Sequence, residues 1–81
     1  MTATTIDVRS LFEETAKIDE LAEYLKRVQD QVVEGQDVIL TGSGPIWLYL
    51  KIAHFLHGKA RKLIYRSPVT GDMVIFDHDP F

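Results

Sequence analysis

The sequence contains no cysteine, and this absence removes several kinds of site at once. It excludes disulfide bonds, thiolate metal centres and cysteine nucleophiles, and it makes a reducing compartment, the cytoplasm, the expected location. The first ten residues lack the basic stretch and apolar core of a secretory signal. The longest apolar stretch, around residues 45–56, is interrupted by Lys51 and His54 and is shorter than the roughly 20 residues that span a bilayer. We therefore expect no membrane partner.

Positive charge is also scarce. Nine basic residues stand against twelve acidic ones, and the resulting net charge of −3 at pH 7 argues against duplex DNA as a partner. The charge is uneven along the chain, because residues 1–50 carry a balance of −5 and residues 51–81 a balance of +2. The basic second part can attract a small anionic ligand, although solvated lysines at a helix end are the commoner reason for such a pattern.

Residues 1–81 are expected to form a single domain, since a chain of this length has room for only one core. Hydrophobic periodicity predicts four strands and two helices in the order β-α-β-α-β-β. The expected strands cover residues 4–12, 37–41, 62–66 and 72–77, and the expected helices cover residues 18–32 and 45–57. A parallel right-handed crossover followed by a hairpin makes this an α+β protein, a two-layer α/β sandwich.

The first helix is predicted from an apolar stripe with spacings of three and four residues. Thr15 or Asp19 is expected to cap its start, and Gly35 stands where it should stop. The stripe comprises Ile18, Leu21, Leu25, Val28 and Val32.

A glycine loop, Gly42-Ser43-Gly44-Pro45, follows the second expected strand and leads into the second helix. Ligands of open α/β sheets bind at this edge, where backbone N–H groups and the positive end of a helix favour phosphate. The loop has neither the lysine of a P-loop nor a complete dinucleotide fingerprint. A plain tight turn explains the glycines about as well as an anion site does.

The second helix is apolar almost all round, which indicates that a second copy of the chain covers part of it. Trp47 and His54 lie seven residues apart on the same side of this helix. A nucleobase can stack on Trp47 while its phosphate contacts the glycine loop. The alternative is that Trp47 belongs to a dimer core and that His54 forms a hydrogen bond inside it.

Two further histidines close secondary-structure elements: His57 ends the second helix and His78 follows the last strand. Imidazoles with nearby carboxylates can hold a divalent ion such as manganese, or they can act as general base and acid towards a phosphodiester. Two histidines are an incomplete metal set, and judged by spacing alone a structural or solvated role is commoner than metal ligation.

The motif Gly42-Ser43-Gly44-Pro45-Ile46-Trp47-Leu48, followed by Ala53-His54, His57, Pro68-Val69-Thr70-Gly71 and His78, resembles the small CRISPR-associated ring nucleases of type III systems. The resemblance implies a ferredoxin-like fold, a homodimer or homotetramer, and manganese-dependent cleavage of cyclic tetra-adenylate. Carried over, Gly42, Ser43, Gly44, Pro45, Trp47 and His54 bind the ligand, and His57 and His78 are the catalytic and metal-binding pair.

The hairpin turn departs from the family pattern D-P-R-x-G, because Ser67 and Val69 stand at the acidic and basic positions. Asp72 or Asp77 can supply the carboxylate and Arg66 the guanidinium, although from other positions. Three hypotheses follow: a metal-dependent phosphodiesterase that linearises the messenger, a noncatalytic protein that sequesters it, and a self-associating domain in which loop and histidines are structural.

Overall fold

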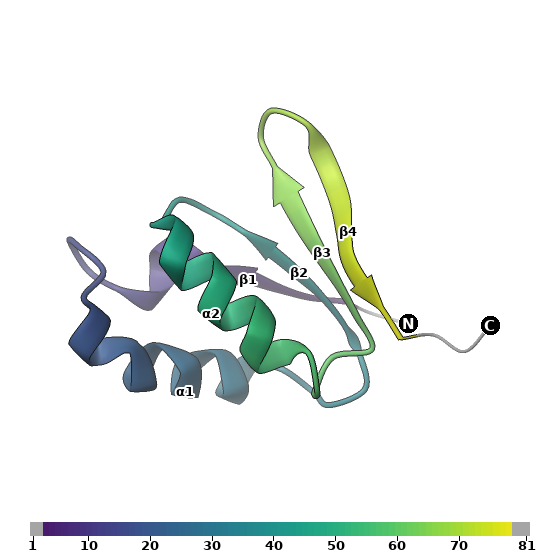
Figure 1. Cartoon of the computed structure of the whole chain (residues 1–81), viewed down its shortest axis with the longest axis horizontal. Coiled ribbons are helices and arrows are strands. Elements are labelled where there is room, and N and C mark those ends of the chain that lie inside the picture. Colours follow the sequence, from purple (N-terminus) through teal and green to yellow (C-terminus); the bar gives the residue numbers. More distant parts are fainter. Residues whose placement is uncertain (1–2, 79–81) are drawn as a thin grey trace.

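The computed structural model describes residues 3–78 as a four-stranded sheet with two α-helices packed against one of its faces (Figure 1). The strands are β1 (Thr4–Asp7), β2 (Asp37–Thr41), β3 (Lys62–Ser67) and β4 (Gly71–Asp77). The helices are α1 (Leu21–Gln31) and α2 (Ile46–Leu56), and two short 3-10 turns, η1 (Val8–Leu11) and η2 (Ile18–Glu20), precede α1. Neither α1 nor α2 has the length and apolar character needed to cross a bilayer within these residues.

The strands lie side by side in the order β1-β2-β3-β4. β1 pairs with β2 and β2 with β3 in parallel, whereas β4 returns antiparallel to β3. The predicted element order, the parallel crossover and the hairpin are therefore confirmed, and so is the two-layer sandwich. A ferredoxin-like fold has the order β-α-β-β-α-β, so this chain shares its layers and differs from it in the arrangement of its strands.

The hydrophobic core lies between the sheet and the two helices, and it receives alternate residues from the strands because successive side chains point to opposite faces. Each helix contributes the stripe that faces the sheet. The buried residues are Ile6, Val8, Leu11, Tyr24, Val28, Val38, Leu40, Leu48, Ile52, Leu56, Ala60 and Leu63. This core holds α2 along the sheet and so determines where both of its ends lie.

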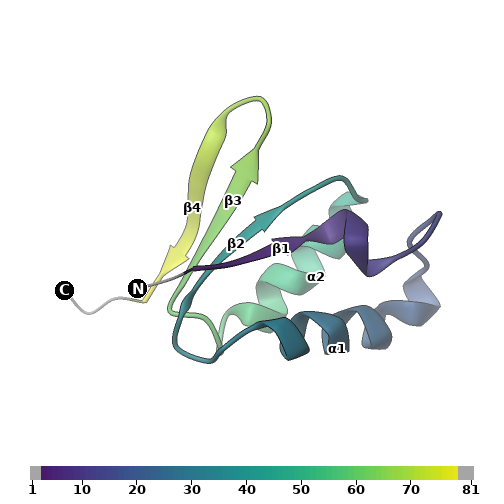
Figure 2. The ribbon, with the colours of Figure 1, turned by 180° about the vertical axis from the view of Figure 1, so that it is seen from behind.

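The opposite face of the sheet is not covered by the helices, and Figure 2 shows its strands in front of them. The register aligns Thr5, Ile39, Ile64 and Val74 in one row across this face. Ile39 and Ile64 are half-buried and Val74 is exposed.

The first strand is shorter than predicted. It ends at Asp7 because the Asp7 carboxylate accepts a hydrogen bond from the Arg9 N–H at 3.0 Å, and the Ser10 hydroxyl donates to the Asp7 carbonyl at 2.6 Å. Side chains that bond to nearby backbone groups favour turns over strands. Residues 8–11 consequently form η1, which lies against the glycine loop.

The predicted start of the first helix is wrong in two respects. α1 begins at Leu21 after η2, and Glu20, which precedes it, makes no side-chain capping bond, so neither Thr15 nor Asp19 is the cap. Ile18 is exposed instead of belonging to the apolar stripe. Tyr24 is buried in its place, because its hydroxyl accepts a hydrogen bond from the Lys17 N–H and donates to Glu20, which satisfies the polar end of the ring.

An ion pair between Asp37 and Arg61 joins the starts of β2 and β3. The Arg61 Nε and Nη2 atoms donate to the two carboxylate oxygens at 2.9 and 3.1 Å. The hydrogen bonding from Arg61 lowers the pKa of the Asp37 carboxyl. A carboxyl whose pKa is lower in the folded state stabilises the fold above its unfolded pKa of about 3.9 and loses that contribution as the pH falls through the folded pKa.

We therefore expect Asp37→Asn to lower the free energy of unfolding by about 1 kcal/mol at pH 7. Between pH 4 and pH 2 the free energy of unfolding should fall less in this variant than in the wild type, because the variant has no Asp37 carboxylate to protonate. Urea denaturation across this pH range measures both effects. Glu34→Gln, which removes an exposed carboxyl from the turn before β2, is the matched control. Parallel pH profiles for Asp37→Asn and the wild type would contradict the prediction.

Candidate functional site

The glycine loop, residues 42–45, joins the carboxyl end of β2 to the start of α2 and packs closely against η1. Gly42 has φ +100°, a conformation that favours glycine. A Cβ at Gly42 would overlap the Asp7 carboxylate, and a Cβ at Gly44 would lie 2.7 Å from the Val8 Cγ1 atom. Close packing thus excludes a larger side chain at both positions, as expected if the loop is a plain tight turn. Gly42, Ser43 and Gly44 are nevertheless exposed.

The start of α2 presents backbone donors beside this loop. Leu48 and Tyr49 make the first intrahelical hydrogen bonds, and both donate to the Pro45 carbonyl. The N–H groups of Ile46 and Trp47 come before these bonds and have no acceptor within the helix. Pro45 supplies no side-chain cap. The Tyr49 hydroxyl donates to the Gly42 carbonyl and holds the loop against the first turn of the helix. Donors and a positive helix end at an exposed loop are suited to an anion.

Trp47 and His54, the predicted ligand-binding residues of α2, differ in their exposure to solvent. Trp47 is half-buried and packs against the hydrophobic core, which covers part of its side chain. His54 is exposed in the last turn of α2. The two cavities with volumes of about 380 and 300 Å³ among residues 3–78 are lined by neither side chain.

His57 and His78, in contrast, are brought together from distant parts of the chain. Their ring centroids lie 4.7 Å apart with the planes at 81°. Phe76 contacts both imidazoles, at 5.2 Å from His57 and 4.8 Å from His78. The His78 N–H donates to the Arg61 carbonyl at 2.8 Å, which holds the end of β4 beside the end of α2. Both histidines remain exposed to solvent.

Phe76 was not among the residues predicted for the site. It lies on the helix-facing side of β4, two residues before His78, and a β-bulge between Leu63 and Ile64 determines which face each residue of this strand occupies. The bulge leaves no clear pattern in the sequence, so the contact between Phe76 and the histidines emerges only from the sheet register.

The donor set for a metal is incomplete in the part of the chain that the structure describes. No group of three or more histidine or acidic side chains is close enough to bind an ion among residues 3–78. Two imidazoles alone do not fit manganese, which prefers several oxygen donors. Asp79, which follows His78 in the sequence, lies outside the described residues.

The glycine loop and the histidine pair lie at opposite ends of α2. The helix has 11 residues, and at about 1.5 Å per residue its ends are about 16 Å apart. A single phosphodiester bound at the loop is therefore out of reach of His57 and His78 in the same chain. The predicted site residues form two separate groups in one copy.

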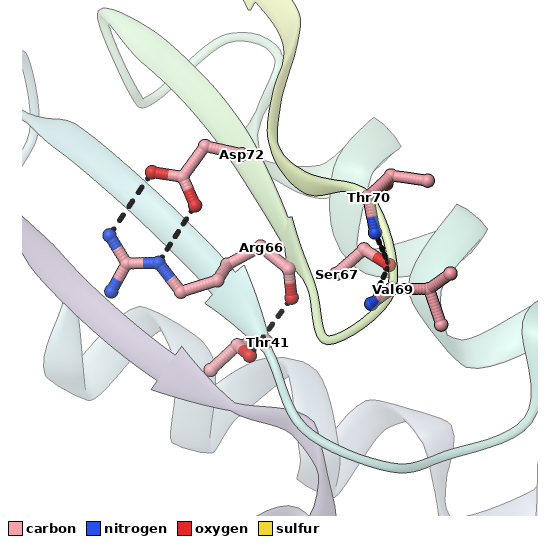
Figure 3. A network of polar contacts seen from close by, with 6 residues as sticks. All are labelled: Thr41, Arg66, Ser67, Val69, Thr70 and Asp72. Atoms are coloured by element: carbon pink, nitrogen blue, oxygen red, sulfur yellow. Dashed lines mark hydrogen bonds and ion pairs between the residues drawn. The ribbon is translucent and has the colours of Figure 1, made fainter.

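The hairpin turn lies at the same sheet edge as the glycine loop, since the Thr41 hydroxyl at the end of β2 donates to the Arg66 carbonyl at 3.1 Å (Figure 3). Arg66 and Asp72 are register partners across the hairpin, and two hydrogen bonds of 2.8 and 3.1 Å join their side chains. This pairing lowers the pKa of the Asp72 carboxyl. In the turn itself, the Ser67 hydroxyl oxygen accepts from the N–H groups of Val69 and Thr70. Arg66 and Asp72, two of the three candidate substitutes for the family's charged turn residues, are thus bonded to each other.

The family model described as CRISPR-associated protein (Cas_csx3) matches residues 12–80 of the chain. The match includes the glycine loop, α2, the hairpin and both members of the histidine pair. No curated protein and no solved structure is similar enough to count as a match.

Proposed function

The chain belongs to the Cas_csx3 family of CRISPR-associated proteins, and from this premise we propose that it is a ring nuclease that binds and linearises cyclic tetra-adenylate. Cleavage of the messenger would switch off the antiviral effectors that it activates. The contact between His57 and His78 carries the proposal, because it unites two distant histidines at an exposed surface.

In this proposal the glycine loop binds phosphate and the histidine pair acts on the bond. A loop and a histidine pair that act on the same phosphodiester come from different copies of the chain, because about 16 Å separates them along α2. A homodimer or homotetramer supplies this arrangement, and the symmetry of a four-adenylate ring suits a symmetric protein partner. The uncovered face of the sheet, where Val74 is exposed beside half-buried Ile39 and Ile64, provides further reason for self-association.

The proposed chemistry is proton transfer. One imidazole accepts the proton of the attacking hydroxyl or water, and the other donates a proton to the oxygen that leaves phosphorus. Contact between the rings places both groups within reach of one phosphodiester. His57 and His78 would supply two nitrogen donors to the manganese that the resemblance implies, and its oxygen donors would have to come from outside the described residues of this chain.

A second candidate function is sequestration without cleavage. The hairpin turn carries no charged side chain between Ser67 and Thr70, and the nearest guanidinium and carboxylate, Arg66 and Asp72, are engaged with each other. A chain that binds the ring and does not cut it would also lower signalling.

Turnover separates the two functions. The purified protein is incubated with a several-fold excess of cyclic tetra-adenylate and manganese, and the intact, bound and linear species are followed by chromatography. We expect linear products in excess of the protein. Stoichiometric capture without products would establish sequestration instead, and the absence of saturable binding would overturn both proposals.

A further inference from the structure

An apolar groove of about 300 Å³ lies between α2 and the β3–β4 hairpin. We call it the α2–hairpin groove. Its lining contains no charged side chain and comprises Leu40, Ile46, Tyr49, Leu50, Ala53, Leu63, Tyr65 and Ile75. Sites for small organic ligands are typically concave and mainly apolar or aromatic, with a few polar groups, and begin at about this volume. The groove therefore has the character of a site for one ring system and is too small for a whole tetranucleotide.

The groove is continuous with the glycine loop. Ile46 and Tyr49, in the first turn of α2, line the groove, and the Tyr49 hydroxyl donates to the carbonyl of Gly42 in the loop. The Tyr49 and Tyr65 rings meet edge to face at 5.4 Å. Burial and the neighbouring Tyr65 raise the pKa of the Tyr49 hydroxyl, which thus stays protonated at neutral pH. A ligand in the groove would have its edge beside the exposed residues of the loop.

Apolar side chains at the rim make the groove accessible without a rearrangement of the core. Leu50 is 65% exposed and Ile75 is 47% exposed. Trp47 lies on a different side of α2 and is half-buried against the core. Part of its ring is therefore covered by the protein and is not available for a base to stack on.

We propose that the α2–hairpin groove binds an adenine base of the ligand whose phosphate contacts the adjoining glycine loop. This inference rests on the proposed function and assigns a base position that the sequence did not indicate. The base lies between the aliphatic wall of α2 and the side chains of Tyr65 and Ile75. A ring of four adenylates shared by two copies brings two bases to each chain, so the groove and Trp47 each take one.

The test compares the affinity for cyclic tetra-adenylate of the wild type with that of Leu50→Ser and Ile75→Ser. Both residues are substantially exposed, so the substitutions leave the buried core intact. Ile18→Ser, which changes another exposed apolar residue in η2, is the matched control. Titration calorimetry gives the affinities, and sedimentation velocity gives the oligomeric state of each variant.

We expect each groove variant to bind about tenfold more weakly than the wild type, with the control unchanged and the oligomeric state preserved. Wild-type affinity in both groove variants would overturn the groove assignment and leave the proposed function standing. A change of oligomeric state with unchanged affinity would assign the groove to a second copy and also overturn it. No binding by the wild type itself would overturn the groove assignment and the proposed function together.

Discussion

Replacing His57 with alanine is expected to reduce the cleavage of cyclic tetra-adenylate at least 100-fold while leaving its affinity within a few-fold of the wild type. General acid–base catalysis by a positioned side chain contributes about 10²–10⁴-fold, and His57 is one of the two imidazoles that contact each other at the end of α2. Ligand affinity should persist, because the glycine loop lies at the other end of the helix. Single-turnover cleavage and titration calorimetry measure the two quantities separately.

Lys26→Ala, which shortens an exposed side chain on α1 away from the proposed site, is the control. We expect it to retain cleavage within a few-fold. His78→Ala should reproduce the loss seen in His57→Ala, and the double variant should lose little more, since groups that act as a unit are not additive. Unchanged cleavage by His57→Ala would remove this residue from the mechanism.

Replacing Gly42 with alanine is expected to lower the free energy of unfolding by about 3 kcal/mol. The backbone at Gly42 has φ +100°, which costs an L-residue about 1–2 kcal/mol. The new Cβ would also overlap the Asp7 carboxylate and lie 3.0 Å from the Val8 backbone nitrogen. This overlap is relieved only if η1 moves away from the glycine loop, and that movement disturbs the packing between them. Urea denaturation monitored by Trp47 fluorescence measures the change.

Two other glycines separate the causes of this effect. Gly35 has φ +84°, and a Cβ added there would meet no atom within 4 Å, so Gly35→Ala should lose only the backbone cost of about 1 kcal/mol. Gly58 is open to solvent and has no positive φ, and Gly58→Ala should change stability by less than about 0.5 kcal/mol. Equal losses at Gly35 and Gly42 would show that the close approach to η1 contributes nothing.

Local pattern was sufficient for most of the fold. The apolar run of β2, the glycine and proline before α2 and the turn chemistry of residues 67–71 each depend on neighbouring residues, and the structure has these elements within one or two residues of the predicted bounds. The strand predicted beyond Asp7 was wrong because a side-chain bond to the Arg9 N–H competes with strand pairing. Such competition between local interactions is weakly visible in composition.

The order of the elements and the identity of the conspicuous residues follow from the sequence alone, because helical and strand periodicities are properties of short segments. Which of these residues meet depends on the folded chain. The packing of α2 along the sheet and the return of β4 bring His57 to His78 and separate both from the glycine loop. The same packing forms the α2–hairpin groove from residues far apart in the chain. Contacts of this kind depend on the sheet register and on the length of α2. These two features position several distant segments relative to one another, so no single segment of the sequence reveals the contacts.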